Sequence, residues 1–135
     1  MALQYSTAVR NAKLDAVETT IGTSAVLKIR TGSPPANCAA ADSGTVLATL
    51  NLPSDWMAAA SGGTKAKSGT WEDTSADNTG TAAHWRLYAS DGTTCGAQGT
   101  VTATGGGGDM TVDSTSFTAG QDFIVTGFTL TAGNA

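Results

Sequence analysis

Charge of either sign is scarce in this 135-residue sequence. Lysine and arginine together number 7 and aspartate and glutamate 11, so charged residues make up 13% of the chain and the net charge is −4. The basic residues are scattered, whereas sequence-independent binding of nucleic acid needs a basic face. We therefore expect no direct contact with nucleic acid.

Long apolar runs are also missing. The longest span only a few residues, far short of the roughly 20 that a membrane-spanning helix needs. The first 18 residues contain no apolar segment of the secretory type, and charges occur from Arg10 onward. We therefore expect no membrane association, and we expect synthesis and use in the cytosol.

Groups that support catalysis or metal binding are few. There is one histidine, His84, and the two cysteines, Cys38 and Cys95, form no Cys-x-x-Cys pair. Most aspartates stand at turn positions, and no serine lies in a Gly-x-Ser-x-Gly element. We therefore predict no enzyme, no cofactor and no catalytic or metal-ligating residue. In a reducing compartment we expect both thiols to be free.

Small side chains dominate what is present. Threonine, alanine, glycine and serine fill 74 of the 135 positions, whereas leucine, isoleucine, valine and phenylalanine fill only 21. The low net charge argues against disorder, but so few large apolar groups predict a thin core. We therefore expect stability to be shared with a partner or with further copies of the chain.

The first 22 residues predict a helix. Ser6 is a suitable N-cap and Gly22 a suitable C-terminal stop. Leu14, Val17 and Ile21 fall on one apolar stripe, and Tyr5, Val9, Ala12 and Ala16 fall on a second. We expect the first stripe to pack on the domain; the second either lies at its margin or contacts another chain.

Strand signals follow Gly22. Apolar residues alternate with polar ones over 24–31, 45–52, 83–89 and 121–131, and Asp91-Gly92 is a hairpin turn signal. Seven to nine short strands at roughly ten-residue spacing predict a mainly β fold, an antiparallel β-sandwich or jelly roll with one N-terminal α-helix. We divide the chain into a helical arm, 1–22, and a single β-sandwich domain, 23–135.

The three tryptophans have two interpretations. Trp56, Trp71 and Trp85 are either large side chains that fill a thin core or interface, or aromatic platforms that stack on sugars. We favour packing. Trp56, which lies between Pro53 and a run of alanines, is the tryptophan expected at an edge or a contact.

Three blocks of sequence together resemble a family of small tailed-bacteriophage proteins that decorate the head. The blocks are RNAKLDAVETTIG (Arg10 to Gly22), SAVLKIRTGSPPANCAAADSGTVLATLNLPSDW (Ser24 to Trp56) and DSTSFTAGQDFIVTGFTLT (Asp113 to Thr131). The resemblance implies a cement protein with a jelly-roll-like domain and a helical arm. Such a protein assembles as a homo-oligomer on the outside of the capsid and clamps neighbouring major capsid subunits.

The expected partners are thus the major capsid protein and further copies of the chain, with a homodimer favoured over a homotrimer. The resemblance implies synthesis in the host bacterial cytoplasm and a final location on the capsid exterior of the virion. Our candidate inter-chain contacts are Leu3, Tyr5, Val9 and Trp56. Two alternatives remain: a glycan-binding module of the tail-fibre or adhesin type, and a low-copy head–tail connector or tail component.

Overall fold

The computed structural model describes residues 3–133. It contains one helix, α1 (Thr7–Ile21), followed by ten strands. The mainly β class with an N-terminal helix, as predicted, is confirmed. The strands are β1 (Val26–Arg30), β2 (Val46–Asn51), β3 (Thr64–Ala66), β4 (Glu72–Asp73), β5 (Gly80–Thr81), β6 (His84–Tyr88), β7 (Cys95–Ala103), β8 (Met110–Val112), β9 (Ser116–Phe117) and β10 (Phe123–Thr131).

Helix α1 begins and ends where the sequence predicts. The Ser6 side chain accepts a hydrogen bond from the backbone N–H of Val9 (3.3 Å) and so caps the first turn. At the other end Gly22 has a φ of 97°, and its N–H donates to the Glu18 carbonyl (2.8 Å). This positive φ lets the chain leave the helix directly for β1.

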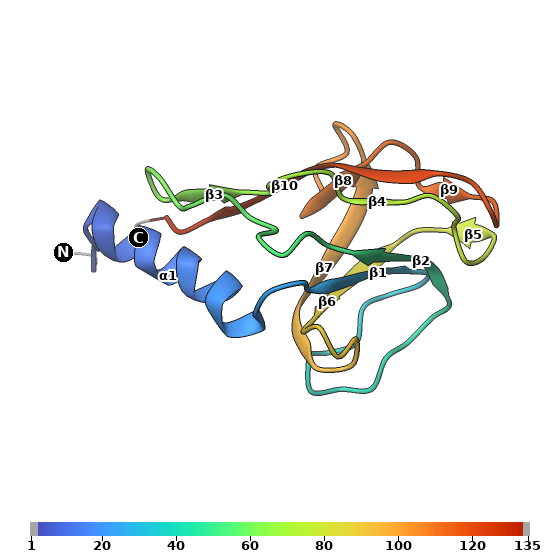
Figure 1. Cartoon of the computed structure of the whole chain (residues 1–135), viewed down its shortest axis with the longest axis horizontal. Helices are drawn as coiled ribbons and strands as arrows, with labels where there is room; N and C mark the ends of the chain where they lie inside the picture. Colours follow the sequence, from blue (N-terminus) through green and yellow to red (C-terminus); the bar gives the residue numbers. More distant parts are fainter. Residues whose placement is uncertain (1–2, 134–135) are drawn as a thin grey trace.

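The main sheet has the strand order β2-β1-β6-β7-β8-β10-β3, with β4 also paired to β10, and β5 and β9 form a separate pair. It curls into a half-barrel. In Figure 1, β1, β2, β6 and the start of β7 form one side, and β10 with β3, β4 and β8 forms the other. The inward faces of the two sides enclose the core, as in a sandwich.

One pair of strands departs from the antiparallel expectation. β8 runs parallel to β7, with Val101 opposite Met110 and Ala103 opposite Val112. Parallel neighbours ordinarily need a long crossover. Here the parallel pairing covers only the last three residues of β7, 101–103, so the connection 104–109 has to return along the strand over that short length alone. The glycine run 105–108 permits this, because Gly105 and Gly107 have positive φ values of 87° and 81°.

The core is built around aromatic rings. Trp71 lies 6.1 Å from Trp56 and 5.5 Å from Phe128, measured between ring centroids, and Phe128 meets Trp85 edge-on at 5.2 Å. Aliphatic side chains of β1 and β2 pack around these rings. Three large indoles thus supply much of the volume that a sequence poor in leucine and isoleucine lacks.

The outer edge of β2 is covered by the segment 73–78. The Asp73 carboxylate accepts the N–H of Thr49 (3.0 Å), and the N–H of Asp77 donates to the Leu47 carbonyl (2.7 Å). At the other end of the sheet, β3 is only three residues long and lies beside helix α1. Both ends of the main sheet are therefore short or occupied.

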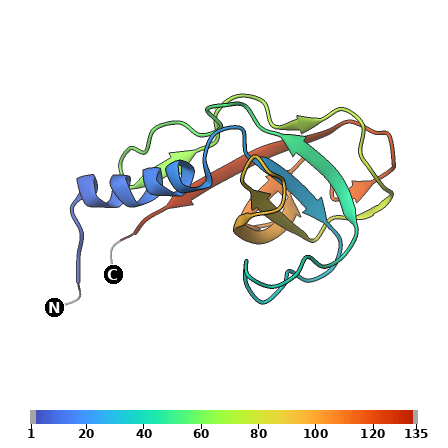
Figure 2. The same ribbon diagram turned by 60° about the horizontal axis from the view of Figure 1, so that its bottom comes forward.

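Helix α1 lies at one end of the molecule, beside β3 and the last part of β10 (Figures 1 and 2). Both termini of the described chain are at this end. The division into an arm (1–22) and a domain (23–135) stays a prediction, and residues 1, 2, 134 and 135 of it lie outside the described part.

Candidate functional site: the exposed helix face and its groove

Three of the four predicted contact residues lie together at the start of the chain and are exposed. Leu3 is 67% exposed, Val9 43% and Tyr5 39%. The amine of Lys13 lies over the Tyr5 ring, 4.4 Å from its centroid. Val9, Lys13 and the exposed Ala12 belong to helix α1, and Leu3 and Tyr5 precede it. We call these exposed side chains together the outer helix face.

The fourth residue, Trp56, is a correction. It is fully buried, and its indole N–H donates to the Gly22 carbonyl at the end of helix α1 (2.9 Å). The run of alanines after Trp56 suggested an edge. The indole instead fills the junction between the helix and the sheet, where it pairs its only polar group.

All three tryptophans are buried: Trp56 and Trp71 are 0% exposed and Trp85 is 3% exposed. A stacking platform for a sugar needs an exposed ring face. The structure therefore favours the packing interpretation of these tryptophans and provides none of them as a surface for glycan binding.

The helix is attached to the sheet by polar side chains as well as by Leu14 and Ile21, which are buried. Asn11, Asp15 and Glu18 lie on one stripe, and each accepts a backbone N–H from the segment 57–63 at 2.9 to 3.0 Å. These bonds leave the outer helix face uncovered. The expectation that Leu14, Val17 and Ile21 pack on the domain is confirmed, with Val17 half-buried.

Lys65 of β3 joins this attachment. Its ammonium group is 98% buried and lies 2.7 Å from Asp15 and 3.1 Å from Glu18. Burial disfavours the charged lysine, but the hydrogen bonds to the two carboxylates outweigh it, so the pKa of Lys65 is raised. The sequence prediction missed this contact because the segment 58–69 has no apolar pattern.

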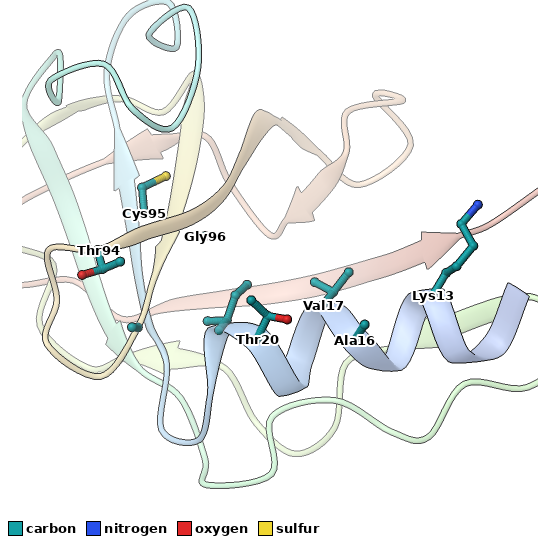
Figure 3. A pocket seen from close by; sticks show the side chains of 9 residues that line it. Lys13, Ala16, Val17, Thr20, Thr94, Cys95 and Gly96 are labelled. Atoms are coloured by element: carbon teal, nitrogen blue, oxygen red, sulfur yellow. The ribbon is translucent and has the colours of Figure 1, made fainter. Parts of the chain in front are cut away.

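A groove of about 420 Å³ separates helix α1 from the β6–β7 turn (Figure 3). Its helix side carries Lys13, Ala16, Val17 and Thr20, whose side chains point toward the ribbon at 94–96. Gly96 makes the close approach possible, because a Cβ there would lie 2.4 Å from the Ile21 side chain. The groove borders the outer helix face and extends it toward β7.

The opposite face of β6 is covered by the loop 31–45. Asp42 accepts hydrogen bonds from Arg86, Tyr88 (2.7 Å) and Arg30 (3.0 Å). Desolvation opposes ionisation of Asp42, but the bonds from Tyr88 and Arg86 outweigh it and lower its pKa. Both oxygens of this carboxylate accept hydrogen bonds from side chains of β1 and β6, so the cluster holds the loop against the sheet.

His84 lies beneath the same loop and is fully buried. Its Nδ1 is 2.7 Å from the Gly32 carbonyl, and its Nε2 is buried with no hydrogen-bond partner among the described residues. Burial, followed by repulsion from Arg30 and Arg86, lowers the pKa of His84. The histidine is therefore neutral near pH 7, with Nδ1 as the donor.

Cys38 and Cys95 are both half-buried and free, as predicted. Cys95 follows the β6–β7 turn, and its sulfur points away from helix α1 (Figure 3). Burial and a hydrogen bond to Cys38 raise the pKa of Cys95 to about 12. Residues 3–133 contain no group of three histidine, cysteine or carboxylate side chains that would hold a metal ion, and no helix there could span a membrane.

Comparison with known proteins identifies no relative. No family model, no curated protein and no solved structure matches the chain. The functional argument therefore depends on the residues themselves.

Proposed function

We propose that this chain is a capsid decoration protein of a tailed bacteriophage. It binds the outside of the head shell, contacts further copies of itself, and stabilises the contacts between major capsid subunits. The observation behind this proposal is the outer helix face, where Leu3, Tyr5 and Val9 stay exposed although the rest of the chain buries its large side chains well.

An exposed apolar surface of this kind is typical of a protein that binds another protein. The exception in the β-domain is Ile124, which is 38% exposed and stands alone on β10. Leu3, Tyr5 and Val9 instead follow one another along the start of the chain. A decoration protein needs such a contact surface and no catalytic group, and repeated weak contacts over a shell sum to a large stabilisation.

The decisive experiment measures copy number and rebinding. Heads of the encoding phage or prophage are stripped of this protein, and the chain is quantified against the major capsid protein by mass spectrometry before and after re-addition. A ratio near one to one, restored on re-addition, supports decoration. A handful of copies per particle would instead indicate a connector or tail component, and absence from the particle would reject the proposal.

A matched pair of variants tests the surface. Val9→Asp places a charge on the outer helix face, and because Val9 is in the first helical turn an acidic residue does not weaken the helix. Ile124→Asp places the same charge at a residue of similar exposure, 38% against 43%, on the β-domain. We expect Val9→Asp to weaken rebinding by at least about tenfold and Ile124→Asp to leave it unchanged.

A further inference from the structure

The main sheet has an unfilled strand position between β7 and β10. β8 pairs with β7 only at 101–103 and with β10 only at 125–128. Beyond this short strand, β7 continues to Cys95 and β10 continues to Thr131. No strand of the described residues lies between these two extensions. We call this opening the strand slot.

On the β7 side, backbone groups face the slot. The N–H of Val101 donates to Ala83 beside β6 (3.1 Å), so by alternation the backbone groups of Thr100 and Gln98 face the other way. The N–H of Thr100 donates to the Asp109 carboxylate (2.9 Å), which lies just before β8 and occupies the place of a strand partner. The N–H and C=O of Gln98 lie two residues further from β8, past this carboxylate.

The β10 side matches it. The Phe128 carbonyl accepts the N–H of Lys67 (3.1 Å), on the side of β3. By the same alternation, Thr129 and Thr131 direct their backbone N–H and C=O groups into the slot. Hydrogen-bonding groups thus line both sides, and strand-edge groups of this kind are the ones with which an added extended segment pairs.

The floor of the slot is apolar. A cavity of about 360 Å³ lies there, and Trp85, Phe128, Ala97 and Leu130 are among its lining residues. The Trp85 and Phe128 rings are buried, whereas Ala97 on β7 and Leu130 on β10 are half-buried at the margin of the core. An added strand would cover both if it placed apolar side chains on its inward face.

The chain itself contains a segment of this kind. Residues 3–6 precede helix α1 and belong to no helix or strand, and Ser6 has an extended backbone (φ −63°, ψ 158°). Leu3-Gln4-Tyr5 alternates apolar and polar side chains with the period of a strand. Leu3 is 67% exposed. In Figure 2 this segment leaves the start of helix α1 at the end of the molecule that lies away from β1, β2 and β6.

We propose that the segment preceding helix α1 of one copy inserts as a strand between β7 and β10 of a second copy. Leu3 and Tyr5 then face Trp85, Phe128 and Leu130. Their backbone groups bond to one side of the slot, at Gln98, and those of Gln4 bond to the other side, at Thr131. Because every copy holds both the segment and the slot, the exchange is reciprocal in a closed dimer. The inference rests on the self-association included in the proposed function and gives it a mechanism.

The first test is the mass of the full chain in solution, measured by sedimentation between about 1 and 100 µM. We expect a dimer, and we expect Leu3→Asp to raise its dissociation constant by about tenfold or more. Ile124→Asp is the matched control and leaves the constant unchanged. A monomer throughout this range, or a dimer insensitive to Leu3→Asp, overturns the proposal.

The second test locates the segment. Gln4→Cys and Thr131→Cys, whose side chains would share the outward face of the sheet, are made in separate chains, in a background with Cys38 and Cys95 replaced by serine and with the melting temperature checked. We expect the mixed chains to form a disulfide-linked dimer under mild oxidation, and neither alone to form it as fast. Cross-linking only when both substitutions are in one chain would show insertion within a single copy and reject the proposal.

Head rebinding separates this inference from the proposed function. If Leu3→Asp is monomeric and still rebinds stripped heads, the dimer uses the slot and decoration does not require it. If the wild-type chain rebinds heads but is never a dimer, decoration stands and the strand exchange is wrong. If the chain dimerises through the slot but does not bind heads, the decoration proposal fails and the exchange stands.

Discussion

The ammonium group of Lys65 lies 2.7 Å from the Asp15 carboxylate and joins strand β3 to helix α1 across 50 residues of sequence. The lysine is 2% exposed, and Glu18 and the Ala58 carbonyl take its other hydrogen bonds. A buried charge with complete hydrogen bonding fixes the position of the helix more strictly than apolar contact does, because a displacement would leave the charge unpaired.

Removing this charge is expected to loosen the helix. Lys65→Met keeps the aliphatic stem but leaves Asp15 and Glu18 without their partner, so we expect a loss of about 2–3 kcal/mol in the free energy of unfolding. Denaturant titration measures it. Lys67→Met, two residues along and only partly buried, is the control and should cost less than about 1 kcal/mol. Equal losses in the two variants would refute the structural role of Lys65.

Acid is expected to destabilise the fold through His84. Its pKa is lowered from the ordinary value of 6.5, so below about pH 6.5 the unfolded chain binds a proton that the folded chain does not. The free energy of unfolding therefore falls as the pH drops through this window, by up to about 1.4 kcal/mol per unit, until the folded-state pKa is reached.

His84→Asn isolates this effect, because its amide N–H can still donate toward the Gly32 carbonyl but does not titrate. Asp42 does not interfere, since its lowered pKa puts its titration in more acidic solution. Urea titrations at pH 7, 6 and 5 should show a smaller pH dependence for the variant. Parallel pH profiles for the two proteins would show that His84 is not the group responsible.

Two glycines with the same backbone angle should respond differently to alanine. Gly44 and Gly92 both have a φ of +71°, but a Cβ at Gly44 would lie 2.0 Å from the Thr31 carbonyl oxygen, whereas Gly92 faces open space. Gly92→Ala should cost about 1 kcal/mol for the left-handed conformation alone. Gly44→Ala should lower the free energy of unfolding by at least about 2 kcal/mol more than Gly92→Ala does. Thermal unfolding of both variants measures this difference, and a smaller difference would show that the loop moves to accommodate the methyl group.

The Cys95 thiol is expected to resist alkylation in the folded protein. With a pKa of about 12, almost none of it is thiolate at pH 8, and the thiolate is the reactive form. Iodoacetamide labelling followed by mass spectrometry should modify Cys95 only after denaturant is added. Rapid labelling of Cys95 in the native chain would contradict the burial that the structure assigns to it.

Local signals in the sequence predicted most of the secondary structure. Ser6 and Gly22 marked both ends of the helix because capping depends on a few neighbouring atoms. β1 and β2 lie within the predicted ranges 24–31 and 45–52, but burial does not simply alternate along them: four of the five residues of β1 and three of the six of β2 are buried. β3 was not predicted, since its one buried side chain is Lys65, whose burial depends on carboxylates 50 residues away.

The candidate surface was predicted only in part. Exposure of Val9 follows from the two stripes of the helix, since one stripe suffices to attach it. The groove depends on the close approach of Gly96 to Ile21, and the strand slot depends on the parallel course of β8; no periodicity of the sequence indicates either. The burial of Trp56 depends on the Gly22 carbonyl, which no local pattern connects with it.

The covering of the β2 edge by Asp73 and Asp77 has a consequence for a protein that gathers at high local concentration. Exposed strand edges on neighbouring molecules would pair and polymerise into fibres. Here the N–H of Thr49 and the C=O of Leu47, which point outward from the middle of β2, are already bonded within the chain. Edge-to-edge pairing of crowded copies along β2 would have to break these bonds first, so this side of the molecule favours discrete units over fibres.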